Sequence, residues 1–217
     1  MFEKSLLFFK KPKVDNNMKV LEFRRLSIED KYDSLYEDGF AWSRPYEYPL
    51  VIEWIKKRHQ PGNVIHNSSW GFAGIHITFK EKLDDVFGNA FHSDILKSEL
   101  PNTFVYDISK NPETAEKEKY DFVLNVSTLE EVKGDHTAIF DNLLRQVKVG
   151  GLLILTFDLN ASRWSPFRKR RVLQLKRFQR FLREKISEPE QPLNGENSIT
   201  QNKKYSRLNC GILVIEK

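Results

Sequence analysis

The apolar positions of residues 120–159 follow two different spacings. Two largely apolar runs, at 122–126 and 152–157, are too short for ordinary helices and are rich in strand-forming residue types. The apolar residues between them recur every three or four positions, as on one helix face: Ile139, Leu143, Leu144 and Val147. The pattern therefore predicts a strand, a helix and a second strand. Because both strands are largely apolar, we expect a parallel sheet covered by helices on both faces.

Shorter segments on either side predict the rest of an α/β domain. We expect strands at 18–23, 64–66, 90–95, 103–108 and 209–216, and helices at 75–87 and from Pro49 onward. Ser27 predicts a capped helix start, and Pro45 with Pro49 predicts an extended or turned chain between them. Residues 188–204, rich in Pro, Asn, Gly and Gln, predict a mobile loop.

Length and composition fit one globular domain. The 217 residues are enough for an α/β domain with a substantial core, and no apolar stretch approaches the ~20 residues that span a bilayer. A single cysteine, Cys210, excludes an internal disulfide framework, and the scattered histidines show no metal-ligand spacing. The N-terminus lacks the cleavage pattern of a signal peptide. We therefore expect a cytoplasmic protein without a metal site.

The net charge of +5 is unevenly distributed. Residues 163–185 contain ten basic residues and one acidic residue, Glu184, so this segment carries +9 and the rest about −4. We expect a basic helix within residues 163–186. Its partner would be an anionic membrane surface or a phosphorylated substrate rather than nucleic acid, because no nucleic-acid-binding motif accompanies it. An ordinary surface helix with its Lys and Arg side chains in solvent is the alternative.

Three segments occur in a recognisable order along the chain: NVIHNSSWGFAG, YDFVLNVSTLEEV and LLRQVKVGGLLILTF. They resemble the first loop, the fourth strand with its following turn, and the helix with fifth strand of class I S-adenosylmethionine-dependent methyltransferases. The resemblance covers roughly residues 62–159 and the last strand. It implies a Rossmann-like methyltransferase domain over 62–217 with an antiparallel C-terminal strand. Residues 1–61 would form an N-terminal extension and lead-in helix.

The resemblance implies S-adenosylmethionine as cofactor, although the first loop departs from the family pattern. His66 and Asn67 stand where the family has an acidic residue, and Trp70 lies where glycine is usual. In this loop the resemblance places the cofactor-binding residues at Asn67, Ser68, Ser69, Gly71 and Gly74.

Acidic residues near the ends of the next two predicted strands complete the implied cofactor site. The resemblance places Asp94 on the ribose hydroxyls, which a carboxylate can accept together, and Asp107 with Ile108 beside the adenine. Asp94 as a helix cap and Asp107 as a turn former are the alternatives.

Polar residues interrupt and follow the carboxyl end of the apolar run at 122–126. Asn125 and Ser127 are expected to face the ligand, because the ligand crevice of an open α/β sheet lies beyond such strand ends. Glu130, Glu131 and His136 are the candidate catalytic bases. First-turn acids favoured by a helix dipole and a capping histidine are the alternatives.

Two functions follow from these features. The first is methyl transfer to an oxygen or nitrogen of a small molecule or cell-surface glycan precursor. The segment WSRPYEYPLVIEWI supports the glycan class, since it resembles the lead-in of some methyltransferases of sugar and glycan clusters, and Arg44 within it could pair with the cofactor carboxylate. The second is a catalytically inactive relative that acts as a binding or scaffold partner through its basic helix.

Overall fold

The computed structural model describes residues 18–34, 43–69, 75–110, 116–159, 168–186, 193 and 209–217; for residues 75 and 168–174 it describes the backbone alone. Most of the predicted mobile loop at 188–204 lies outside these ranges. So do Trp70, Gly71 and Gly74 of the first loop.

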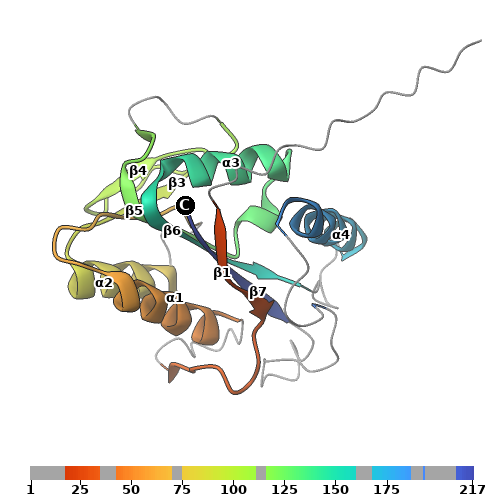
Figure 1. Ribbon diagram of the computed structural model, residues 1–217, viewed down its shortest axis with the longest axis horizontal. Coiled ribbons are helices and arrows are strands. Elements are labelled where there is room, and N and C mark those ends of the chain that lie inside the picture. The colour runs from red at the N-terminus through yellow and green to blue at the C-terminus, as the bar shows by residue number, and fades with distance from the viewer. Residues whose placement is uncertain are drawn as a thin grey trace, which may run out of the picture.

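Seven strands form one sheet in the order β1-β7-β6-β5-β2-β3-β4 (Figure 1). Neighbours from β6 to β4 run parallel, and β7 is antiparallel to both β6 and β1. The predicted mostly parallel sheet with an antiparallel C-terminal strand is therefore confirmed. The strands are β1 (Lys19–Arg25), β2 (Ile65–Asn67), β3 (Ala90–Asp94), β4 (Thr103–Val105), β5 (Tyr120–Val126), β6 (Val147–Asp158) and β7 (Cys210–Glu216).

Helices cover both faces of this sheet, as predicted. Helices α1 and α2 lie on one face and α3 and α4 on the other (Figure 1). Within the described residues, no helix is both long enough and apolar enough to cross a membrane. The helices are α1 (Arg44–Arg58), α2 (Ile75–Phe87), α3 (His136–Gln146) and α4 (Arg168–Lys185), with a 3-10 turn η3 (Leu129–Glu131).

Alternate side chains of the central strands fill two separate cores. On β5, Phe122 and Leu124 pack beneath α1 and α2, whereas Val123 packs beneath α3 and α4. Successive side chains of a strand point to opposite faces. A strand covered on both faces must therefore be apolar at nearly every position, which explains the largely apolar run at 122–126.

The helix after β5 ends one residue earlier than its apolar pattern predicts. Helix α3 stops at Gln146; Val147 is already extended, with ψ 132°, and pairs with Tyr120 as the first residue of β6. The prediction that Val147 lies on the helix was wrong, because Val147 is buried as a residue of the sheet. Gly151 then passes so close to β5 that a Cβ would lie 2.6 Å from the Asp121 carbonyl oxygen, so only glycine fits.

Helix α1 begins at Arg44, so the prediction of an extended chain between Pro45 and Pro49 was wrong. Pro45 lies in the first turn, where its missing N–H has no helical partner to lose. Pro49 cannot donate to the Pro45 carbonyl four residues earlier. The backbone N–H of Asp33 donates to that carbonyl instead, at 3.0 Å. A tertiary contact thus satisfies the acceptor that Pro49 leaves open.

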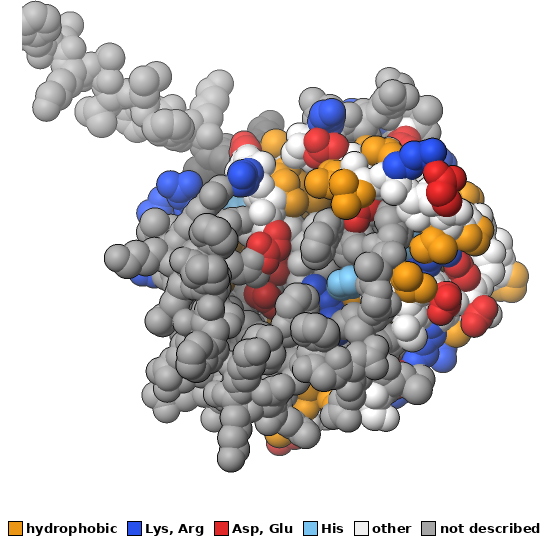
Figure 2. Space-filling view, turned by 180° about the vertical axis from the view of Figure 1, so that it is seen from behind, with side chains coloured by type: hydrophobic (Ala, Val, Ile, Leu, Met, Phe, Trp, Pro, Cys, Tyr) orange, Lys and Arg blue, Asp and Glu red, His pale blue; other side chains and the backbone are white. Residues whose placement is uncertain are grey.

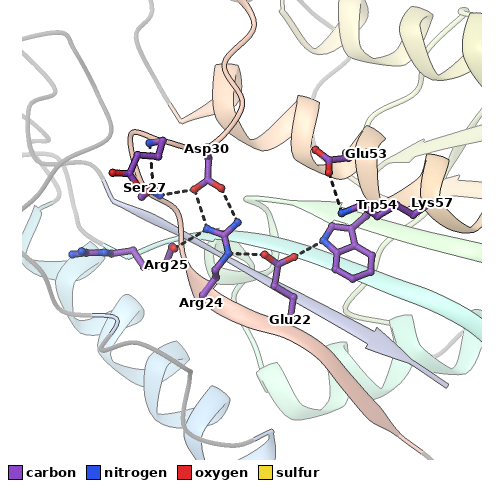
Figure 3. Close-up of polar contacts among 9 residues, drawn as sticks. Glu22, Arg24, Arg25, Ser27, Asp30, Glu53, Trp54 and Lys57 are labelled. Atoms are coloured by element: carbon purple, nitrogen blue, oxygen red, sulfur yellow. Dashed lines mark hydrogen bonds and ion pairs between the residues drawn. The ribbon is translucent and has the colours of Figure 1, made fainter.

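Strand β1 is tied to α1 by polar contacts (Figure 3). Arg24 donates to Glu22 at 2.6 Å and to both carboxylate oxygens of Asp30, at 2.6 and 2.9 Å, and the indole N–H of Trp54 donates to Glu22. Asp30 also accepts from the backbone N–H of Ser27 at 2.6 Å. The predicted helix start at Ser27 was wrong, because residues 28–30 form a turn.

The sheet order creates a topological switch point at the carboxyl ends of β2 and β5. From β2 the chain builds outward to β3 and β4, then returns to place β5 on the opposite side of β2. The connections on either side of β2 leave in opposite directions, and this is the position where open α/β sheets bind their ligands.

Candidate functional site

Hydrogen bonds of polar side chains connect the ends of β2 and β5 at the switch point. Both the backbone N–H and the hydroxyl of Ser68 donate to the Leu124 carbonyl, at 2.8 and 2.9 Å. Asn125 donates to the Ser68 carbonyl at 2.8 Å and accepts from Leu129 N–H at 2.8 Å, and Ser69 accepts from Val126 N–H at 2.8 Å. The side chains of Ser68, Ser69 and Asn125 therefore frame the start of the first loop.

Asn67, the last residue of β2, is oriented by a chain of buried hydrogen bonds. His92 Nε2 donates to Asp84 at 2.9 Å, and Asp84 pairs with the buried Lys80 at 2.6 Å. A carboxylate only accepts, so the proton lies on Nε2 of a neutral His92, and His92 Nδ1 accepts from Asn67 Nδ2 at 3.2 Å. Burial lowers the pKa of His92, which keeps the ring neutral.

This orientation turns the amide oxygen of Asn67 away from His92. Asn67 is 6% exposed, and its Oδ1 has no hydrogen-bond partner among the described residues. A buried acceptor without a donor is costly. The amide oxygen at the end of β2 is therefore a hydrogen-bond acceptor that suits a donor group of a bound ligand.

Ser127 links the end of β5 to a buried ion pair on α1. Its hydroxyl donates to Glu47 at 2.5 Å, and its φ of 41° is in the left-handed region, which is strained for serine. Glu47 is fully buried and also accepts from Ser43 at 2.9 Å and Arg44 at 2.5 Å. Burial opposes the charge of Glu47, but the Arg44 guanidinium and the Ser127 hydroxyl outweigh it and lower its pKa.

Glu130 and Asp158 form a carboxyl pair beside this ion pair. Glu130, in η3, is buried and accepts from the backbone N–H of Asp158 at 2.7 Å, whereas Asp158, at the end of β6, is partly exposed. Burial and the neighbouring Asp158 raise the pKa of Glu130 to about 8; burial and Glu47 raise that of Asp158 to about 7. The pair can hold a proton near neutral pH.

His76, at the start of α2, lies between Asp94 and the ion pair. Its Nδ1 is 2.7 Å from the Tyr48 hydroxyl, and its electrostatic neighbours include Arg44, Glu47 and Asp94. Burial and Arg44 lower the pKa of His76 to about 4, so the ring is neutral at pH 7. The ends of β3 and β5 and the starts of α1 and α2 thus meet around one group of polar side chains.

The two acidic residues expected at the cofactor differ in their burial and hydrogen bonds. Asp94 is 5% exposed at the end of β3 and accepts from Leu96 N–H at 2.9 Å. Asp107 is more exposed and accepts from the N–H and hydroxyl of Ser109, at 2.9 and 2.6 Å, contacts that lower its pKa; Ile108 is buried in the core beneath α3. Both carboxylates accept hydrogen bonds within a turn, from residues two positions later in the chain. Their cofactor-binding roles remain predictions.

The remaining candidates lie away from the switch point or outside the described residues. Glu131 is exposed on η3. The His136 ring packs against Phe178 of α4, with ring centroids 5.3 Å apart, and burial lowers its pKa. Gly71 and Gly74 lie outside the described ranges. Among the described residues no group of His, Cys, Asp or Glu is arranged to hold a metal ion.

Four residues of this site were not among the predicted site residues or had another predicted role. Arg44 was expected to meet the cofactor carboxylate, but its guanidinium binds Glu47. Glu47, His76 and Asp158 were not identified as site residues. The charged residues at 44 and 47 inside an apolar helix could have indicated a site from the sequence. No neighbouring sequence feature indicated a site role for His76 or Asp158.

Comparison with known proteins agrees with this architecture. No protein-family model and no curated protein matches the chain. Among solved structures, the CurJ carbon methyltransferase superposes with a TM-score of 0.54 at 13% identity, covering 85% of this chain and 57% of that one. The trans-methyltransferase CalH in complex with SAH gives 0.51 at 16% identity, covering 85% and 60%.

A third solved structure is matched over its full length. A chain of the complex between the Haloferax volcanii Trm112 methyltransferase activator and a methyltransferase superposes with a TM-score of 0.51 at 11% identity, covering 88% of this chain and 100% of that one. By contrast, the chain spans less than two thirds of the CurJ and CalH chains. These likenesses establish the fold: the protein has the fold of class I S-adenosylmethionine-dependent methyltransferases.

Proposed function

We propose that the protein is an S-adenosylmethionine-dependent methyltransferase that methylates an oxygen or nitrogen of a small molecule or glycan precursor. The proposal rests on the arrangement of side chains at the switch point. Hydrogen-bonded polar side chains, a buried hydrogen-bond acceptor that no described residue fills, and a carboxyl pair that can hold a proton lie together at these strand ends. When bound, the cofactor supplies an activated methyl group. The protein then has to align the acceptor atom and remove its proton.

The residues at the end of β2 fit the cofactor. The Oδ1 atom of Asn67 is a buried acceptor that no described residue fills, and the ammonium group of S-adenosylmethionine is a donor of the matching kind. Ser68 and Ser69 have their hydroxyls bound to β5, so their side chains hold the start of the loop at the end of that strand. His66 cannot replace the acidic residue of the family here, because it is buried against Gln146 and Ser93.

The residues at the end of β3 fit a nucleoside. Asp94 provides a carboxylate for the ribose hydroxyls. Directly after it, the apolar side chains of Ile95 and Leu96 are 61% and 60% exposed, and Val105 on the neighbouring β4 is 58% exposed. An adenine ring placed on them would cover apolar surface that is otherwise in water.

We assign proton removal to the pair of Glu130 and Asp158. Asp158 is partly exposed and can receive a proton from an acceptor group, while the buried Glu130 shares the resulting proton. A pair that titrates near neutral pH suits general base catalysis. Glu131 is exposed and His136 is packed against α4, so neither has this environment.

Replacing Asp94 tests the cofactor site. We expect Asp94→Ala to weaken S-adenosylhomocysteine binding by about 10–100-fold, because hydrogen bonds to a charged group each contribute about 1.5–3 kcal/mol. Isothermal titration calorimetry of the variant and the wild type measures the difference. Asp85→Ala is the matched control, since Asp85 is exposed on α2. Equal affinity of wild type and Asp94→Ala would contradict the assignment.

A transfer assay separates the two functions proposed from the sequence. The wild-type protein is expected to convert S-adenosylmethionine to S-adenosylhomocysteine when an acceptor from a panel of sugars, amino sugars and small amines is present. The Glu130→Gln variant should bind the cofactor normally and lose turnover. Cofactor binding without turnover on any acceptor would favour the binding or scaffold alternative.

A further inference from the structure

Helix α4 is fixed to the body of the protein by one face only. Leu175, Phe178 and Leu182 are buried, and the ring of Phe178 packs edge-on against Phe157 of β6 with centroids 5.3 Å apart. Lys185 is buried as well and pairs with Asp141 of α3 at 2.9 Å. These contacts determine which side of the helix faces outward.

The outward face of α4 is strongly basic. Lys176, Arg177, Arg180 and Arg183 are all exposed there. Glu184 is the one acid among the described residues of α4; it lies 4.0 Å from Arg180, and both side chains are more than 70% exposed, so the pair contributes little. Elsewhere, the described part of the face in Figure 2 shows acidic, basic and apolar side chains intermixed.

The cations on this face form a row beside a shallow hollow. Lys176, Arg180 and Arg183 are spaced at i, i+4 and i+7, which places them on one side of the helix. Together with Gln179 and Glu184 they line a hollow of about 410 Å³. The aromatic residues of the described part of α4, Phe178 and Phe181, are buried, so none is available there to stack on nucleic-acid bases.

We propose that α4 docks the protein on an anionic phospholipid surface through Lys176, Arg177, Arg180 and Arg183. The described exposed face has cations and no apolar side chain, so the helix would lie on the headgroups without inserting. Charge complementarity is the argument for this partner: nine basic residues against one acid in α4, on a chain whose net charge is only +5.

The docking face adjoins the strand ends of the candidate site. Gln179, which lines the hollow, donates to the carbonyl of Leu159 at 3.1 Å, the residue directly after Asp158. Helix α4 also contacts η3, which carries Glu130. A membrane bound by α4 would therefore lie near the carboxyl pair. This position suits an acceptor presented at a lipid surface, although the docking itself does not depend on methyl transfer.

Vesicle flotation tests the proposal. The full chain is mixed with equimolar phosphatidylcholine–phosphatidylglycerol vesicles or with pure phosphatidylcholine vesicles, at low and high salt. We expect binding to the anionic vesicles only, weakened by salt. Reversing two cations in Lys176→Glu/Arg180→Glu should lower the partition coefficient by about 100-fold or more, since each cation at such a surface contributes about fivefold.

A control with the same change in net charge makes the result specific. Lys56→Glu/Lys97→Glu reverses two exposed cations away from α4 and should bind within about threefold of the wild type. Equal loss in both variants would overturn the proposal, as would equal binding to neutral vesicles. Displacement from the vesicles by duplex DNA or RNA at a lower phosphate concentration than the lipid would also overturn it, and would identify a nucleic acid as the partner.

Discussion

The Glu47→Ala variant is expected to lose about 3–5 kcal/mol of unfolding free energy, the cost of leaving one member of a buried ion pair without its partner. Glu47 is fully buried, and Arg44, which is 7% exposed, would lose the carboxylate with which it forms an ion pair at 2.5 Å. Ser43 and Ser127 would lose the acceptor of their hydroxyls in the same step. Urea denaturation followed by circular dichroism measures the loss.

The same helix offers a matched control for Glu47. Glu53 pairs with Lys57 at 3.0 Å, but both side chains are about half exposed, so Glu53→Ala should cost no more than about 1 kcal/mol. Glu47→Gln keeps the shape of the side chain and removes only its charge, which provides a second variant should Glu47→Ala not fold. If Glu47→Gln and Glu53→Ala proved equally mild, the ion pair would not be the element that holds α1 to the end of β5.

The unfolding free energy of the wild type is expected to fall as the pH rises from about 6.5 to about 8. In the unfolded chain both carboxyls of the Glu130–Asp158 pair are ionised well below this range. In the folded protein Asp158 retains its proton to about pH 7 and Glu130 to about pH 8. The folded state binds more protons, so raising the pH favours unfolding, by on the order of 1–2 kcal/mol across this window.

Glu130→Gln should make this pH dependence shallower, because glutamine has no proton to lose and only the contribution of Asp158 remains. The other titratable groups around the pair do not interfere: Arg44 stays charged, the lowered pKa of Glu47 keeps it ionised, and the raised pKa of Cys210 keeps its thiol protonated. The histidines with lowered pKa values release the protons of the unfolded chain around pH 6.5, so they raise stability with pH and partly offset the fall at the lower end of this window. They are the same in both proteins, so the difference between variant and wild type reports the pair. These histidines are His66, His76, His92 and His136.

Chemical denaturation at several pH values checks the prediction, with Glu131→Gln as the control. Glu131 is the next residue and is exposed, so its replacement should leave the wild-type slope intact. A Glu130→Gln variant with the slope of the wild type would show that the pair does not hold a proton near neutral pH. Its assignment as the proton acceptor would then fail.

The sheet was predictable from the sequence because its central strands are buried on both faces. Largely apolar runs at 122–126 and 152–157 have few other structural solutions, and both became central strands. Local signals failed where a tertiary contact decided the outcome. Pro49 fits inside α1 because Asp33 satisfies the Pro45 carbonyl, and Asp33 lies in a different part of the chain.

The candidate site was predictable only in part, for the same reason. Residues at the end of a strand, such as Ser127 and Asp94, could be placed there from their position in the sequence alone. Burial that depends on the fold could not be predicted in this way. Glu130 acquires its raised pKa from burial and from Asp158, which is distant in sequence, and Asn67 acquires its orientation from His92 on the neighbouring strand.

The central claim is that the strand ends of β2, β3 and β5 form a site for S-adenosylmethionine, and calorimetric titration of the wild-type protein tests it most directly. We predict micromolar binding of S-adenosylmethionine and S-adenosylhomocysteine, with a rise in melting temperature that grows with ligand concentration. Absence of both heat and thermal shift at millimolar concentrations of either ligand would contradict the claim.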